Sequence, residues 1–388
     1  MNTQSDNVLR AACILIAAGS ILAVGIQPIF IGLLVERLGL TLAQQSSVMS
    51  AEMCGSIFGT LACVPIMRRF SVRTTALLAA SALLVSNLFT AQVSDVSMLM
   101  AARVVAGIGS GILYAYSIFG LGGLRDPDRS YGVLLFMQTA LFAFSAATVP
   151  LIAGRLGFGW AINYLSIWFA LICFACMFLP RTTAPKPKNT TDANAKSLSV
   201  VGVFSLIGMV LLQVSIYSLW GFVEGIGTDA GIGAVEIGWA LSVGLLGGLP
   251  GAALPSLLGK KLGRVPMILT GSTIVLAAIV MFATAIRSAV DLGIAVFLMN
   301  VGWNLALSYY MSSVVAHDPT GRLTRMVGSL QVISAAAAPT ILMVLIGNQG
   351  RQEIFTLSAG SVLLGGLSMA VMLVLNRRRK TEADFAIQ

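Results

Sequence analysis

Two charged residues, Glu52 and Arg103, lie inside long apolar stretches, where a charge needs a physical reason. A charged side chain at the centre of a bilayer costs at least about 2.5 kcal/mol on insertion scales. Glu52 lies about ten residues and Arg103 about seven residues inward from the predicted outer ends of their stretches, so their depths differ by only about 5 Å. Two interpretations stay open: a pair in which protonation of Glu52 releases Arg103, or a static pair that fixes helix packing.

A second candidate site follows from a stripe of polar and aromatic residues after position 199. Gln213, Tyr217, Trp220 and Glu224 are spaced by four, three and four residues, which places them on one helical face. Exposure of such a polar stripe to lipid is unfavourable, so we expect it to line a cavity or contact another helix. Tyr and Trp also favour membrane interfaces. Glu224 is a second candidate for protonation, although its match with Glu36 in an internal repeat favours a structural role at a helix end.

The remaining candidate substrate-binding residues are polar or aromatic groups inside other apolar stretches: Gln27, Tyr114, Gln138, Asn300, Trp303, Asn304 and Gln331. For any one of them, a hydrogen bond between helices is the simpler interpretation. Taken with Arg103, the set combines aromatic surface, amides and one positive charge. That mixture suits a small organic or aromatic anion better than a sugar or a polycation, because the guanidinium can pair with a carboxylate.

The composition indicates that lipid is the solvent of the elements that carry these residues. Hydrophobic residues are 57% of the 388, charged residues are 10%, and the mean hydropathy is +0.90. A soluble domain carries roughly 25% charged residues. We therefore expect an all-α membrane protein. Twelve apolar runs are each long enough to cross a bilayer: 9–35, 43–66, 74–92, 97–119, 131–153, 161–180, 199–223, 236–258, 265–286, 290–313, 326–347 and 354–376.

The distribution of Lys and Arg predicts the orientation. With a cytoplasmic N-terminus, most of the 24 basic residues fall in cytoplasmic segments, and only Arg37, Arg155, Arg287 and Arg351 fall outside. The net charge of +9 is thus explained by topology, and no nucleic-acid partner is expected. We predict a multi-pass protein of the inner (plasma) membrane with both termini in the cytoplasm.

The polar run 181–198 is predicted to be a cytoplasmic linker between two copies of one design. Residues 1–180 and 199–376 are the expected six-helix bundles, followed by a cytoplasmic tail at 377–388. An offset near 190 superposes four features in order. Val35-Glu36-Arg37-Leu38-Gly39 matches Val223-Glu224-Gly225-Ile226-Gly227, and Arg68-Arg69-Phe70-Ser71-Val72-Arg73 matches Lys260-Lys261-Leu262-Gly263-Arg264. Asp126-Pro127 matches Asp318-Pro319, and Gln138 matches Gln331. Parallel repeats of this kind occur in secondary transporters.

The chain resembles the major facilitator superfamily of secondary transporters over essentially its whole length. Arg103-Val-Val-Ala-Gly107-Ile-Gly109 is similar to the family's Arg-x-x-x-Gly-x-Gly motif. The basic loop 68–73 is similar to the family's signature between helices two and three, but Arg68 stands where the family usually has an acid and Ser71 where it has glycine. The resemblance implies a twelve-helix fold in two parallel six-helix repeats. It also implies that helices one, four, seven and ten line a central cavity.

Other chemistries find little support in the sequence. Cys173 and Cys176 have metal-ligand spacing but lie in an apolar run without a second pair, so packing explains them better than a metal. His317, the single histidine, lies in a predicted loop. We expect no metal, no cofactor and no enzymatic activity, because no clustered acid or metal set is present.

These observations together predict a monomeric secondary transporter of a small organic solute, with protons and the lipid bilayer as its other partners. We favour proton-coupled symport of an organic or aromatic anion by alternating access, with Glu52, Arg103 and Glu224 as the candidate coupling residues. The alternative within the class is a proton-driven exporter of drugs or hydrophobic compounds. A passive channel would be distinguished by the absence of saturable exchange.

Overall fold

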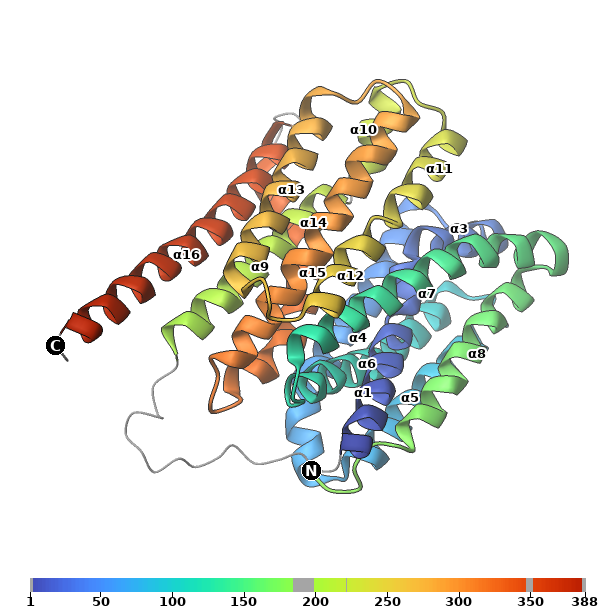
Figure 1. Ribbon diagram of the computed structural model, residues 1–388. Helices are drawn as coiled ribbons and strands as arrows, with labels where there is room; N and C mark the ends of the chain where they lie inside the picture. The colour runs from blue at the N-terminus through green and yellow to red at the C-terminus, as the bar shows by residue number, and fades with distance from the viewer. Residues whose placement is uncertain (1–2, 184–198, 221, 347–351, 386–388) are drawn as a thin grey trace. The chain divides into compact units, whose positions relative to one another are not determined.

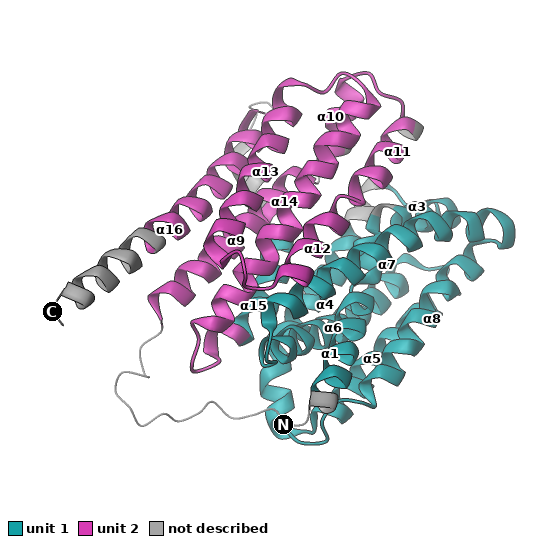
Figure 2. Ribbon diagram, viewed as in Figure 1, with its two compact units in different colours: residues 1–188, 325–336 teal, residues 189–324, 337–388 magenta. Residues whose placement is uncertain are grey.

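The structure is a computed structural model that describes residues 3–183, 199–220, 222–346 and 352–385, and every regular element in these ranges is an α-helix. The chain divides into two compact units (Figure 2). Unit 1 comprises residues 1–188 and 325–336, and unit 2 comprises residues 189–324 and 337–388. Most of the predicted linker lies outside the described residues. Because 325–336 group with unit 1, the allocation of six helices to each bundle stays a prediction.

Unit 1 is built mostly from long helices that run side by side (Figure 1). They are α1 (Thr3–Ser20), α2 (Leu22–Gly25), α3 (Gln27–Leu38), α4 (Leu42–Arg69), α5 (Val72–Thr90), α6 (Val96–Gly122), α7 (Pro127–Leu156) and α8 (Phe158–Cys176). Residues 325–336 of α15 complete the unit.

Side-chain caps set where α4 and α6 begin. Thr41 and Gln44 form a capping box in which the Gln44 amide donates to Thr41 Oγ1 at 3.3 Å and the Thr41 amide donates to Gln44 Oε1 at 2.9 Å. At the start of α6, the amide of Met98 donates to Asp95 Oδ1 at 2.8 Å. These caps fix the helical registers of the two helices that carry the buried charges.

The single helix predicted over 9–35 is instead three helices, α1 to α3. The backbone leaves regular helical geometry at Ile21 (φ −105°, ψ 18°) and again at Ile26 (φ −108°, ψ 26°). Pro28 lies in the first turn of α3, where its missing N–H is tolerated. The break at Ile26 therefore falls directly before Gln27-Pro28, whereas the break at Ile21 has no signal that we recognise in the sequence.

Unit 2 contains α9 (Val200–Trp220), α10 (Val223–Asp229), α11 (Ala234–Leu245), α12 (Gly248–Leu258), α13 (Arg264–Thr284), α14 (Ala289–Ala316), the rest of α15 (Arg322–Ile346) and α16 (Gln352–Phe385). The helix predicted over 199–223 ends earlier, at Trp220. The interruption between α11 and α12 is slight, since Gly247 keeps helical angles of −56° and −26°. The backbone of α16 stays helical beyond residue 376, where a tail was predicted.

Ten stretches of the described residues are long and apolar enough to cross a membrane. They correspond to ten of the twelve predicted spans, with α11 and α12 together forming one of them. The other two predictions, 9–35 and 326–347, fall on α1–α3 and on α15. A count of twelve thus stays a prediction.

Glycines bring α4 and α6 of unit 1 into backbone contact. A Cβ atom added at Gly55 would meet the carbonyl oxygen of Val104, and one added at Gly59 would meet that of Ile108. Because neither position has room for a side chain, the two helices pack as a small-residue interface, as in other transmembrane helix pairs.

Unit 2 repeats this contact with different residues. A Cβ at Gly247 would meet the carbonyl oxygen of Phe297 on α14, and one at Gly251 would meet that of Val301. The positions differ from those of unit 1 by 192 on the first helix (55 to 247, 59 to 251) and by 193 on the second (104 to 297, 108 to 301). The duplication predicted from the sequence is therefore present in the packing of these helices.

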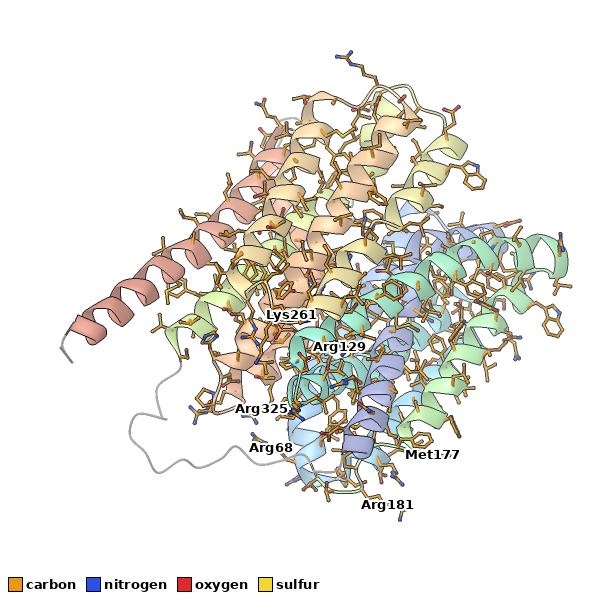
Figure 3. The ribbon with its side chains drawn as sticks, viewed as in Figure 1. Arg68, Arg129, Met177, Arg181, Lys261 and Arg325 are labelled. Carbon is orange, nitrogen blue, oxygen red and sulfur yellow. The ribbon has the colours of Figure 1, made fainter. Side chains whose placement is uncertain are left out.

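Two basic side chains of unit 1, Arg68 and Arg181, lie toward one end of its helices (Figure 3). The first turn of α5 contacts the segment after α8 at this end, because Arg73 Nε donates to the carbonyl oxygen of Leu179 at 2.9 Å. A concentration of positive charge at one end is what the positive-inside rule leads us to expect. That this end faces the cytoplasm stays a prediction.

Candidate functional site

The centre of the candidate site is a buried ion pair between α4 and α6. Arg103 Nη2 lies 2.5 Å from Glu52 Oε1, and Arg103 Nε donates to Glu52 Oε2 at 3.2 Å. Arg103 is 0% exposed and Glu52 is 5% exposed. Two parallel N–H to O contacts of this kind hold both groups in one plane. The structure thus places in contact the two charges whose similar depth the sequence predicted, whereas their role stays a prediction.

Two features of Arg103 were not apparent from the sequence. Its guanidinium carbon lies 4.7 Å from the centre of the Phe30 ring, a cation–π distance. Its Nη1 atom is buried and has no hydrogen-bond partner. Phe30 belongs to α3 and follows the break after α2, and its residue type did not distinguish it from the many other apolar residues of the first span.

The close packing of α4 and α6 explains why the pair forms here. A Cβ at Gly107 would meet the backbone carbonyl of Glu52 itself, so the two helix backbones are in contact at this level. One turn further along, Ser56 Oγ and Ser110 Oγ are 3.1 Å apart. With the backbones this close, the carboxylate and the guanidinium meet across the helix pair.

The duplicated half of the chain shows that this packing does not need the ion pair. Offsets of 192 and 193 place Gly244 opposite Val296 where unit 1 has Glu52 and Arg103, and a Cβ at Gly244 would meet the Val296 side chain. The same helix pair therefore packs in unit 2 with a glycine and a valine. A purely structural role for the two charges accordingly loses support.

Unit 2 holds a second polar cluster, which joins α9 to α14. Trp303 Nε1 donates to Gln213 Oε1 at 2.6 Å. The Trp303 and Tyr217 rings meet edge to face, with centres 5.9 Å apart and planes at 79°. The structure thus brings together three of the residues that the sequence analysis singled out. Trp220, a fourth, ends α9 and is half-buried.

The two asparagines of α14 use their amides along their own helix. Asn300 Nδ2 donates to the carbonyl oxygen of Val296 at 2.9 Å, and Asn304 Nδ2 donates to that of Asn300 at 3.0 Å. Both residues are buried. In this structure their donors are satisfied locally, as the simpler interpretation of an isolated polar residue in a span expects.

The other candidates lie on several elements. Tyr114 Oη on α6 donates to Gln331 Oε1 at 3.1 Å, and both residues belong to unit 1 because 325–336 group with it. Gln138 lies on α7, and its Oε1 is buried without a partner. Gln27 begins α3 and is half-buried. Glu224 lies on α10, and its side chain is outside the described residues.

Comparison with known proteins places this arrangement in a family. The family model described as Major Facilitator Superfamily matches residues 13–342. The chain belongs to the major facilitator superfamily. Membership makes the protein a multi-pass membrane transporter, and the resemblance noted from the motif at Arg103 is confirmed.

A solved structure of this superfamily shows the same fold. The crystal structure of the human organic anion transporter MFSD10 (TETRAN) superposes with a TM-score of 0.72, covering 94% of this chain and 99% of that one. The two sequences are 16% identical, so the likeness supports the fold. A search of curated proteins found no significant match.

Proposed function

We propose that the protein carries organic anions across the membrane together with protons, by alternating access, and that the exchange takes place at Arg103. The observation that carries the proposal is the buried ion pair with Glu52. Arg103 has an unpartnered nitrogen in addition to the two that Glu52 holds. The equivalent helices of unit 2 pack with Gly244 and Val296 at the positions of the two charges, which supports a role beyond packing.

The chemistry of the step follows from the charge balance of the pair. A proton from solution binds a Glu52 carboxylate oxygen, and the carboxyl group becomes neutral. The guanidinium of Arg103 then loses its counter-charge and pairs with the carboxylate of the substrate through Nη1 and Nη2. The site is neutral before the step, with one negative and one positive charge. It is neutral again afterwards, because the substrate replaces the charge that the proton removed.

The coupling is thermodynamic. Leaving one member of a buried ion pair uncompensated costs about 3–5 kcal/mol. If a proton binds Glu52 without an anion, Arg103 is left uncompensated, and if an anion binds without a proton, one negative charge is left uncompensated. The proton and the anion therefore each strengthen binding of the other by a factor on the order of 100 or more. Movement of one substrate carboxylate would then require one proton.

The aromatic ring beside the guanidinium adds selectivity in this proposal. Phe30 presents a ring to the guanidinium, and it can contact an aromatic part of the substrate while Arg103 holds the acid. The human structure named above is that of an organic anion transporter. That name agrees with the proposal, which rests on the charges at Arg103.

Thermal stabilisation of the purified protein tests the substrate class. The panel contains aromatic carboxylates, sugars and lipophilic cations, each measured at two pH values with wild type and with Arg103→Gln. We expect carboxylates to raise the melting temperature of wild type more at the lower pH and to leave Arg103→Gln unchanged. Stabilisation by cations with no response to acids would contradict the proposal and support an exporter of hydrophobic compounds.

A further inference from the structure

A wide apolar groove lies on the surface of unit 2, apart from the buried ion pair. Its volume is about 810 Å³, and it is lined by the turn after α10, by α11 and by the beginning of α14. Two of its apolar lining side chains are largely uncovered, with Trp239 70% exposed and Val290 69% exposed. Along helices that cross a membrane, such side chains face lipid. The groove is therefore open to the hydrocarbon chains of the bilayer.

Two side chains of opposite charge stand at one end of this groove. Ala240 on α11 lies opposite Gly293 on α14, so Glu236, one turn earlier on α11, is level with the first residue of α14, Ala289. Arg287 precedes that residue by two positions. Both charged side chains line the groove and are exposed. Among the described residues they form no ion pair with each other or with any other group.

A third charged residue, Asp291 in the first turn of α14, accepts hydrogen bonds from neighbouring residues. Its Oδ2 accepts a hydrogen bond from Ser288 Oγ at 2.8 Å and another from the Arg287 amide at 3.2 Å. Its own amide donates to Ser288 Oγ, which completes the N-terminal cap of α14. Asp291 thus serves the helix end and lies within electrostatic reach of Arg287. The side chains of Glu236 and Arg287 are exposed and can bind a ligand.

The duplicated half of the chain lacks these features. At an offset of 192, Gln44 and Ser47 stand at the positions of Glu236 and Trp239, and at an offset of 193 Ser94 stands at that of Arg287. The charged and aromatic residues are consequently not demanded by the fold. Tryptophan is also a side chain that favours the headgroup level of a bilayer.

We propose that this groove binds one phospholipid whose headgroup carries both a phosphate and a primary ammonium. The phosphate pairs with the Arg287 guanidinium and the ammonium donates to the Glu236 carboxylate. An acyl chain lies against the apolar residues between α11 and α14. A headgroup with a single charge would leave one of the two side chains without a partner. This site is independent of the transport proposal.

Native mass spectrometry of the delipidated full chain tests the site. Phosphatidylethanolamine, phosphatidylcholine and phosphatidylglycerol are added in turn to wild type, Glu236→Gln and Arg287→Gln. The control is the double variant Glu36→Gln, Arg37→Gln, which removes the same two charges from exposed positions on α3.

We expect wild type to retain phosphatidylethanolamine roughly two- to fivefold better than the other two lipids, the range that one exposed charge pair supports. Glu236→Gln should lose the preference for the primary amine over its trimethylated counterpart. Arg287→Gln should bind all three lipids more weakly, and the control should behave as wild type. Equal retention of the three lipids by wild type, strongest retention of phosphatidylglycerol, or the same loss in the control would overturn the assignment.

Discussion

Replacing the Glu52–Arg103 pair by the residues at the duplicated positions separates stability from transport. Glu52→Gly alone leaves Arg103 buried without its counter-charge, and Arg103→Val alone does the same to Glu52. Each single change should lower the free energy of unfolding by about 3–5 kcal/mol. The double variant should recover most of this loss, because Gly244 and Val296 pack in the same way between the corresponding helices of unit 2.

The magnitude for the double variant combines two effects. Replacing a buried ion pair by apolar residues is neutral or stabilising by about 1–4 kcal/mol, and glycine inside a helix costs about 1 kcal/mol relative to alanine. The double variant should therefore be close to wild type in stability, while substrate-driven stabilisation and transport disappear. Thermal unfolding at one fixed scan rate measures the four proteins, since unfolding of a chain of this size can depend on scan rate.

Either of two results would refute this reasoning. If the losses of the two single variants simply add in the double variant, the pair contributes to the fold in a way that glycine and valine cannot replace. If the double variant is stable and still transports a carboxylate, the ion pair is not the substrate site.

Three further changes, with Gly154→Ala as a control, test the packing near the ion pair of unit 1 and the Trp303–Gln213 contact of unit 2. Gly107→Ala should destabilise the protein by about 1–3 kcal/mol because the new methyl group meets the backbone of Glu52. Gly154→Ala should be neutral or slightly stabilising, because a Cβ atom there meets nothing within 4 Å. Thermal unfolding compares the two variants, and equal losses of stability would count against the close contact of α4 and α6. Phe30→Leu should lower the free energy of unfolding by about 1–2 kcal/mol, because the cation–π contact with Arg103 is lost. If thermal unfolding and carboxylate binding are both unchanged, Phe30 is not part of the site. Trp303→Phe should cost about 1–3 kcal/mol because Gln213 loses its donor, and no change in unfolding would show that this bond is dispensable.

The sequence was most informative where a rare residue type stood in an apolar stretch. The depths of Glu52 and Arg103 predicted that they could meet, and the motif around Arg103 predicted the family. The four-residue spacing of Gln213 and Tyr217 placed them on one face, and Trp303 meets both in the structure. Charges and amides stand out in a membrane helix because lipid tolerates few of them.

Other features depended on backbone paths that apolar residues encode weakly. Phe30, which contacts Arg103, lies on α3 beyond the breaks at Ile21 and Ile26, and these isoleucines carry no breaking signal of their own. The grouping of 325–336 with unit 1 likewise depends on packing between distant segments. The glycines that repeat at 192 residues were not singled out in the sequence, because they acquire meaning only once the helices they join are known.

The central claim is that one proton enters with each carboxylate and that the step is electrically neutral. Full-length protein reconstituted in liposomes is given a labelled aromatic carboxylate, with the pH gradient and the membrane potential set separately. We predict that an acidic exterior drives accumulation in wild type, that the potential alone drives none, and that Glu52→Gln exchanges substrate without accumulating it. Accumulation driven by the potential alone, or unimpaired acid-driven accumulation in Glu52→Gln, would contradict the account.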